Sequence, residues 1–304
     1  RFDEYGNDKI TGTNGFYAMK AHWSEHPDRD EAWADAERAR IGEERFRREH
    51  ECEFLIFDET LISSLTLADM EGTTPVETTG QVRWFKRPTP GHTYMVSLDP
   101  SMGTGGDFAA IQIFELPTFE QIGEWHHNMT PMNQQVRILQ GINKHIHDTI
   151  MEKDASATPQ IFYSMENNTI GEAALMRVMD IGEENIMGMF LSEPIRKGHR
   201  RKFRRGFNTT AKHKIDACTK FKELVEGGKM KINSQLLISE MKDFVASGLS
   251  YKAKPGQHDD LVSACLLMTR MMKVLADFDP KIFEKWTDRT SEVTPMPIFG
   301  SFTG

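Results

Sequence analysis

Acidic side chains stand at three points where the predicted secondary structure changes. Asp99 directly follows one apolar strand, Glu166 directly follows another, and Asp259 and Asp260 open a strongly amphipathic helix. Residues just past strand ends meet at one edge of a sheet, and a helix packed on that sheet can direct its N-terminus to the same edge. Because carboxylate oxygens are the ligands that Mg²⁺ and Mn²⁺ prefer, this spacing points to a site for divalent metals.

Such a cluster would suit the hydrolysis of a phosphodiester. Two divalent ions about 3.5–4 Å apart can activate a water molecule and stabilise the leaving oxygen. Three or four carboxylates in one place repel one another, and bound metals relieve that repulsion. The structural alternative is that an Asp after a strand belongs to a turn and that Asp259 and Asp260 cap their helix. Spacing alone leaves both interpretations open, although Glu166 followed by Asn167 and Asn168 is an unusual turn sequence.

Hydrophobic patterns predict the elements that would hold these residues. The predicted strands are residues 92–98, 108–114, 121–127, 160–165 and 187–191. The predicted helices are residues 132–151, 171–180, 210–226, 235–245 and 259–276. The first three strands follow one another closely enough to form an antiparallel meander, and the later strands alternate with helices. This order predicts a mixed α/β sheet, with parallel strands beside the meander and helices on its faces.

Composition excludes several classes of protein. The 304 residues are 38 % hydrophobic, which is too apolar for a disordered chain. No apolar run approaches the roughly 18–20 residues that span a bilayer, so we expect no contact with a membrane. Residues 1–10 are charged and polar, unlike a secretory signal. The cysteines Cys52, Cys218 and Cys265 lie far apart, which argues against a disulfide framework or a cysteine zinc site and suits a reducing cytoplasm.

Charge is unevenly distributed along the chain. The net charge is −8, and residues 1–60 carry most of that excess, with nine Lys or Arg against sixteen Asp or Glu. The segment RKGHRRKFRR, residues 196–205, holds seven cations and no acidic residue. A run of this kind neutralises phosphates and gives sequence-independent affinity for DNA; its alternative is a solvated loop. The DNA-contact candidates are Arg196, Lys197, Arg200, Arg201, Lys202, Arg204, Arg205, Lys212 and Lys214.

Three stretches of sequence resemble the nuclease domain of the large terminase subunits of tailed bacteriophages. They are LDPS with GTGGDFAAI in residues 98–111, YSMENN in residues 163–168, and HDDLVSA in residues 258–264. In addition, GEERFRREHECEF in residues 42–54 resembles the end of that family's ATPase part. The resemblance covers roughly residues 40–275, and the acidic motifs occur in the family's order.

The resemblance implies a ribonuclease H-like fold and a two-metal endonuclease that cuts double-stranded viral DNA during packaging. It implies that Asp99 bridges two Mg²⁺ or Mn²⁺ ions and that Glu166 is the second motif's carboxylate. Asp259 and Asp260 form the third motif, and we slightly favour Asp260 as the ligand. Asp107 would hold a metal-bound water, with a cap on the Gly-rich turn as the equal alternative.

The chain departs from the full-length family because it has no GxxxxGK[ST] motif, so we expect no ATPase activity. We predict that residues 1–78 are a linker or remnant of the preceding ATPase domain. Residues 79–277 would form the nuclease domain and residues 278–304 an irregular tail. The partners expected are double-stranded DNA, the terminase ATPase domain, the portal and the small terminase subunit, in the host bacterial cytoplasm.

Two other functions remain open at this point. One is a DNA-binding or docking module of the packaging motor that does not cleave, in which the acidic cluster is structural. The other is a resolvase of the same fold that acts on branched DNA. The first would bind DNA without cutting it, and the second would differ in the substrate that it prefers.

Overall fold

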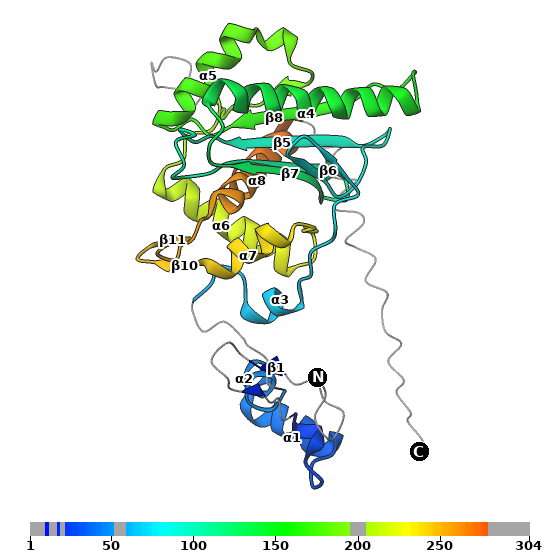
Figure 1. Ribbon diagram of the computed structural model, residues 1–304, viewed down its shortest axis with the longest axis vertical. Helices are drawn as coiled ribbons and strands as arrows, with labels where there is room; N and C mark the ends of the chain where they lie inside the picture. The colour runs from blue at the N-terminus through cyan, green and yellow to red at the C-terminus, as the bar shows by residue number, and fades with distance from the viewer. Residues whose placement is uncertain (1–9, 12–16, 19–21, 52–58, 195–204, 279–304) are drawn as a thin grey trace, which may run out of the picture. The chain divides into compact units, whose positions relative to one another are not determined.

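The computed structural model describes residues 10–11, 17–18, 22–51, 59–194 and 205–278 (Figure 1). Contacts along the chain divide it into two compact units, Arg1–Phe57 and Asp58–Gly304. This division lies upstream of the boundary that we expected at residue 79, because segments before that point pack with the larger unit. None of the described helices is long and apolar enough to cross a bilayer.

The smaller unit has a helical core of its own. Its elements are β1 (Ile10–Thr11), β2 (Tyr17–Ala18), the 3-10 helix η1 (Trp23–Glu25), α1 (Glu31–Ile41) and α2 (Glu43–His50). The carboxylate of Asp30 accepts a hydrogen bond of 2.8 Å from the Trp33 amide and so caps α1. Trp23, Ala34 and Phe46 are buried together. Trp33 and Ile41 of α1 pack against this cluster, and the guanidinium of Arg38 lies over the Phe46 ring, 4.5 Å from its centroid.

The larger unit is built on a seven-stranded mixed sheet with the order β3-β4-β7-β6-β5-β8-β9. Its strands are β3 (Glu77–Thr79), β4 (Val82–Trp84), β5 (Thr93–Asp99), β6 (Ala109–Leu116), β7 (Glu120–His127), β8 (Gln160–Met165) and β9 (Met189–Phe190). The meander β5–β6–β7 is antiparallel, whereas β8 runs parallel to β5 and β9 parallel to β8. The predicted mixed sheet is therefore confirmed.

Helices cover both faces of this sheet (Figure 1). The helices of the larger unit are α3 (Ser64–Asp69), α4 (Met132–Lys153), α5 (Thr169–Ile181), α6 (Ala211–Glu226), α7 (Gln235–Asp243) and α8 (Asp260–Phe278); a 3-10 turn, η2 (Glu183–Asn185), follows α5. Alternate β5 residues, among them Val96 and Leu98, are buried with α4 and α5. Ser97 points to the opposite face, where its hydroxyl donates to the Ala264 carbonyl of α8 at 2.8 Å.

In the larger unit, one short α-helix and two hairpins were not predicted from the sequence. Helix α3 lies in the segment before residue 79 that we interpreted as a linker or remnant of another domain, and the β3–β4 hairpin crosses that boundary. A second hairpin joins β10 (Phe244–Ser247) to β11 (Ser250–Ala253), where we predicted the end of a helix. The apolar pair Phe244 and Val245 continues the amphipathic pattern of α7, which explains why the helix seemed to extend further.

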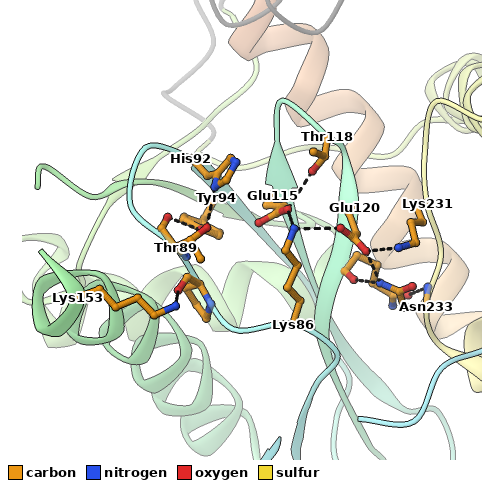
Figure 2. Close-up of polar contacts among 12 residues, drawn as sticks. Lys86, Thr89, His92, Tyr94, Glu115, Thr118, Glu120, Lys153, Lys231 and Asn233 are labelled. Atoms are coloured by element: carbon orange, nitrogen blue, oxygen red, sulfur yellow. Dashed lines mark hydrogen bonds and ion pairs between the residues drawn. The ribbon is translucent and has the colours of Figure 1, made fainter. Parts of the chain in front are cut away.

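A polar cluster holds the end of the sheet opposite to Asp99 (Figure 2). The ammonium group of Lys86 lies between the buried carboxylate of Glu115 and that of Glu120. Glu120 also accepts hydrogen bonds from Lys231 at 2.5 Å and from the Asn233 amide at 3.2 Å. Because Lys231 and Asn233 follow α6, the cluster ties this connection to the turn between β6 and β7.

Candidate active site

Asp99 and Glu166 lie side by side at the carboxyl ends of parallel strands. The strands are paired in register up to Leu98 and Met165, so the next residue of each is an acidic neighbour of the other. The Glu166 amide donates to the Leu98 carbonyl at 3.1 Å, which extends the ladder to this point. Burial, the charge of Glu166 and a hydrogen bond between the two side chains raise the pKa of Asp99 well above its usual value.

Helix α8 brings Asp259 and Asp260 to the same edge of the sheet. Both residues act electrostatically on Asp99. Burial, followed by the charge of Asp259, raises the pKa of Asp260 to about 6. The charge of His258 and the Phe108 amide, which donates to this carboxylate, lower the same pKa and oppose the shift. The exposed Asp107 adds to the same negative field. The structure thus places Asp99, Glu166, Asp259 and Asp260 at one edge of the sheet within electrostatic reach of one another, and Asp107 within reach of Asp260.

The two aspartates do not have to cap their own helix, because a residue of α7 does so. One carboxylate oxygen of Glu240 accepts hydrogen bonds from the Leu261 amide at 2.8 Å and the Val262 amide at 3.1 Å. Asp259 instead accepts a hydrogen bond of 3.3 Å from the Ala253 amide of the β10–β11 hairpin. The capping role that the sequence left open for Asp259 and Asp260 is therefore supplied from elsewhere.

Glu240 sits in a largely buried environment. Burial raises its pKa to about 8, although the amides of α8 partly oppose this shift. His126, at the end of β7, lies 3.7 Å from Glu240 and stacks on Phe108 with ring centroids 4.1 Å apart. Burial lowers the pKa of His126 to about 4, so this ring is neutral at physiological pH. The His126 side chain is only 12 % exposed, since Phe108 and α7 cover it.

The turn after Asp99 is fixed by Gln135 of α4, a residue that the sequence analysis missed. Its fully buried amide donates to the Ser101 carbonyl at 2.9 Å and to the Thr130 carbonyl at 2.7 Å. It also accepts from the Ser101 amide at 3.3 Å. Gly103 has a φ of 68°, and a Cβ there would come within 2.1 Å of the Thr130 carbonyl oxygen. The Gly-rich turn therefore packs tightly against the start of α4.

The two asparagines after Glu166 explain why this turn has an unusual sequence. The Asn167 amide donates to the Phe207 carbonyl at 2.7 Å, and its side chain donates to the Arg205 carbonyl at 2.7 Å. Asn168 caps α5 by accepting from the Gly171 amide at 2.8 Å, and its own amide group donates to Glu166 at 3.3 Å. The Asn167 side chain thus holds the Arg205 segment next to Glu166, and the Asn168 side chain holds the start of α5.

The DNA-contact candidates are only partly described. Lys214 of α6 lies 3.9 Å from the carboxylate of Asp259, and Lys212 is exposed on the same helix. Arg205 forms an ion pair with Glu183. The remaining candidates fall outside the described residues, namely Arg196, Lys197, Arg200, Arg201, Lys202 and Arg204.

Arg270 of α8 joins the two segments that flank the basic run. Its guanidinium forms an ion pair with Glu193, which precedes the run, and donates to the Asn208 carbonyl, which follows it, at 3.0 Å. The same group lies over the Phe207 ring, 5.2 Å from its centroid. Because Asn167, next to Glu166, donates to the Arg205 carbonyl, the described end of the run lies close to Glu166.

The donor set suits a hard divalent cation. Every acidic side chain in the cluster offers oxygen ligands, and the raised pKa values of Asp99 and Asp260 reflect burial together with repulsion that a cation would relieve. Within the part of the chain that the structure describes, no three His, Cys, Asp or Glu side chains already converge as a ready-made metal site.

Comparisons with known proteins agree with the fold. The family model described as the terminase RNaseH-like domain matches residues 96–271. The large terminase nuclease from thermophilic phage G20c with bound magnesium superposes with a TM-score of 0.52 at 16% identity, over 70% of this chain and 97% of that chain. The same nuclease with bound cobalt gives a TM-score of 0.51 at 16% identity, with the same coverage of 70% and 97%. At this level of identity the superpositions support the fold, and the family match is the more specific finding.

Proposed function

The chain belongs to the terminase RNase H-like domain family, and we propose that it is a metal-dependent endonuclease that cuts double-stranded viral DNA during genome packaging. The observation that carries this proposal is the pairing of Asp99 with Glu166 at the strand ends, faced by Asp259 and Asp260 of α8. A cluster of half-buried, mutually repelling carboxylates costs the fold stability, and functional sites are where such groups with shifted pKa values are found most often.

In this proposal Asp99, Glu166 and Asp260 hold two divalent ions, Mg²⁺ or Mn²⁺, and Asp259 assists Asp260. The G20c nuclease structures with bound magnesium and cobalt support a divalent ion in this fold. Such ions supply activation of a water nucleophile and neutralisation of charge at the phosphodiester. Asp107 contributes from the exposed side of the cluster through water.

The chain's own groups have three tasks in the reaction. The carboxylates would fix the position of the metals. Asp99 and Glu166 stand at the ends of β5 and β8, and the burial of these strands keeps that position rigid. Lys214, beside Asp259, attracts a DNA phosphate toward the cluster. The basic run and Lys212 hold the DNA backbone without regard to sequence, since phosphate contacts position the duplex rather than read it.

We also propose that the chain acts as part of a terminase packaging assembly, as the name of the family implies. The partners are the terminase ATPase domain, the portal and the small terminase subunit, and the place of action is the host bacterial cytoplasm. The acidic segment of residues 28–59 would offer a surface to a partner such as the portal or the ATPase domain, with a solvated helix face as the alternative.

A plasmid cleavage assay tests the proposal. The purified chain is incubated with supercoiled DNA and Mg²⁺, Mn²⁺ or EDTA, beside Asp99→Ala, Glu166→Ala and the control Asp216→Ala on the exposed surface of α6. We expect cutting that requires metal and is lost in the first two variants only. Binding without cutting in every sample would favour the docking module, and a strong preference for four-way junctions would favour a resolvase.

A further inference from the structure

The N-terminus of α8 has an unusual arrangement of acceptors. The first amides of a helix lack partners within the helix, and the side chain at the preceding position usually accepts from one of them. Asp259 occupies that preceding position, and its backbone carbonyl accepts from the Ser263 amide at 2.8 Å. Its carboxylate, however, faces Ala253 and Lys214 rather than the amides of α8.

The missing acceptor comes from a different helix. A single oxygen of Glu240, on α7, lies 2.8 Å from the Leu261 nitrogen and 3.1 Å from the Val262 nitrogen. The Glu240 side chain is 10 % exposed, and His126 borders its other oxygen at 3.7 Å. Its position is therefore set by packing on several sides, and it reaches α8 only because the two helices lie against each other.

We propose that Glu240 is a positioning residue for the nuclease site: it caps α8 from α7, so that the carboxylates of Asp259 and Asp260 are not drawn back to the amides of their own helix and stay available to the catalytic cluster. This inference rests on the proposed function. It assigns Glu240 no contact with metal or DNA, and what matters is the reach of its side chain to the two amides. An aspartate that turned back to cap α8 would leave the cluster with one carboxylate fewer.

Three substitutions separate the reach of the side chain from its carboxyl group. Glu240→Gln keeps the length and an acceptor oxygen but cannot ionise. Glu240→Asp keeps the carboxyl group but is one methylene shorter, and Glu240→Leu fills the space without an acceptor. Glu223→Gln, on the exposed side of α6 in a pair with Lys220, is the matched control. Each variant is tested as the full chain for cleavage rate at increasing Mg²⁺ and for the rise in Tm that Mg²⁺ produces.

If Glu240 acts through the reach of its side chain, the cleavage rate of Glu240→Gln should stay within about threefold of the wild-type rate. Glu240→Asp and Glu240→Leu should lose about 10–100-fold, the range measured for residues that orient metal ligands, and should need more Mg²⁺ for half-maximal rate and Tm shift. If Glu240→Leu does not fold, a higher cleavage rate in Glu240→Gln than in Glu240→Asp still supports the proposal.

The opposite order, with Glu240→Asp active and Glu240→Gln inactive, would overturn the proposal, because it would show that the site needs the carboxyl group of Glu240 rather than the reach of its side chain. Unchanged rates and Mg²⁺ dependence in all three variants would overturn it as well. A wild-type chain that does not cleave DNA at any metal concentration would instead count against the proposed function. In that case the Mg²⁺-induced Tm shift of the variants still tests whether Glu240 organises the cluster.

Discussion

The carboxyl group of Asp99 lies beside that of Glu166, its neighbour at the end of the adjacent parallel strand. Two carboxyl groups in this position cannot both be ionised without strong repulsion, and the pKa of Asp99 is raised accordingly by burial and by Glu166. Without a metal, the pair therefore costs the fold stability, and that cost can be measured separately from activity.

We predict that Asp99→Asn raises Tm in EDTA, by about 2–4 °C if it relieves about 1 kcal/mol of repulsion. Added Mg²⁺ should raise the Tm of the wild type and leave the variant nearly unchanged, because the variant has lost a metal ligand. Cleavage should fall more than about 100-fold, since the loss of a ligand exceeds the loss of a residue that orients one. Differential scanning fluorimetry gives Tm, and the surface variant Asp216→Asn is the control. A variant less stable than the wild type in EDTA would show that the pair does not repel.

The turn after Asp99 provides a second prediction. Gln135→Leu keeps the volume of the buried side chain but removes its hydrogen bonds to Ser101 and Thr130. Leaving these backbone groups unpaired should lower the free energy of unfolding by about 2–3 kcal/mol and reduce cleavage about 10–100-fold. Urea unfolding and plasmid cleavage measure the two effects.

The matched control for this change is Gln134→Leu, because Gln134 is the exposed neighbour on the same helix. It should change neither quantity appreciably. If Gln135→Leu has the same midpoint of urea unfolding as the wild type, the hydrogen bonds of Gln135 do not hold the turn.

Lys214 provides a third prediction, which concerns DNA binding. It is measured in the Asp99→Asn background so that the DNA stays intact. Lys214→Ala should weaken binding to all duplex sequences alike and reduce the slope of log affinity against log salt by about 1, as expected when one phosphate contact is lost. Lys220→Ala, which removes an exposed cation of α6 paired with Glu223, is the control. An unchanged slope in the Lys214 variant would remove Lys214 from the DNA-binding track.

The sequence predicted most of the sheet and the acidic cluster because both have local signals. Strands such as β5 and β8 are apolar runs that end at an acidic residue, and the amphipathic pattern of α8 begins at Asp260. Motif order supplied the rest, through the resemblance to terminase nucleases. These signals lie within short stretches of the sequence, so they can be recognised without knowledge of the fold.

The residues that hold the cluster in place have no such signal. Glu240 looks like any polar residue of a surface helix, and only the packing of α7 on α8 brings it to the Leu261 and Val262 amides. Gln135 sits beside the exposed Gln134 and is distinguished only by burial. The short α3 and the β10–β11 hairpin were missed for a related reason, because tertiary contacts stabilise elements of this length more than local propensity does.

The last prediction concerns pH and the cluster that fastens the other end of the sheet. Burial alone would raise the pKa of Glu120, but hydrogen bonds from Lys231, Asn233 and Lys86 outweigh it and lower that pKa below its usual value of 4.5. A lowered carboxyl pKa means that ionised Glu120 stabilises the fold above pH 4.5 and that this contribution is lost as the pH falls through the folded-state pKa. Glu120→Gln should therefore be less stable than the wild type at pH 7, by about 1 kcal/mol, and the two should converge in acid. Urea unfolding from pH 7 to pH 3 measures the difference, with Glu152→Gln on the exposed side of α4 as the control. A difference that stays constant over this range would mean that Glu120 contributes through packing rather than through its charge.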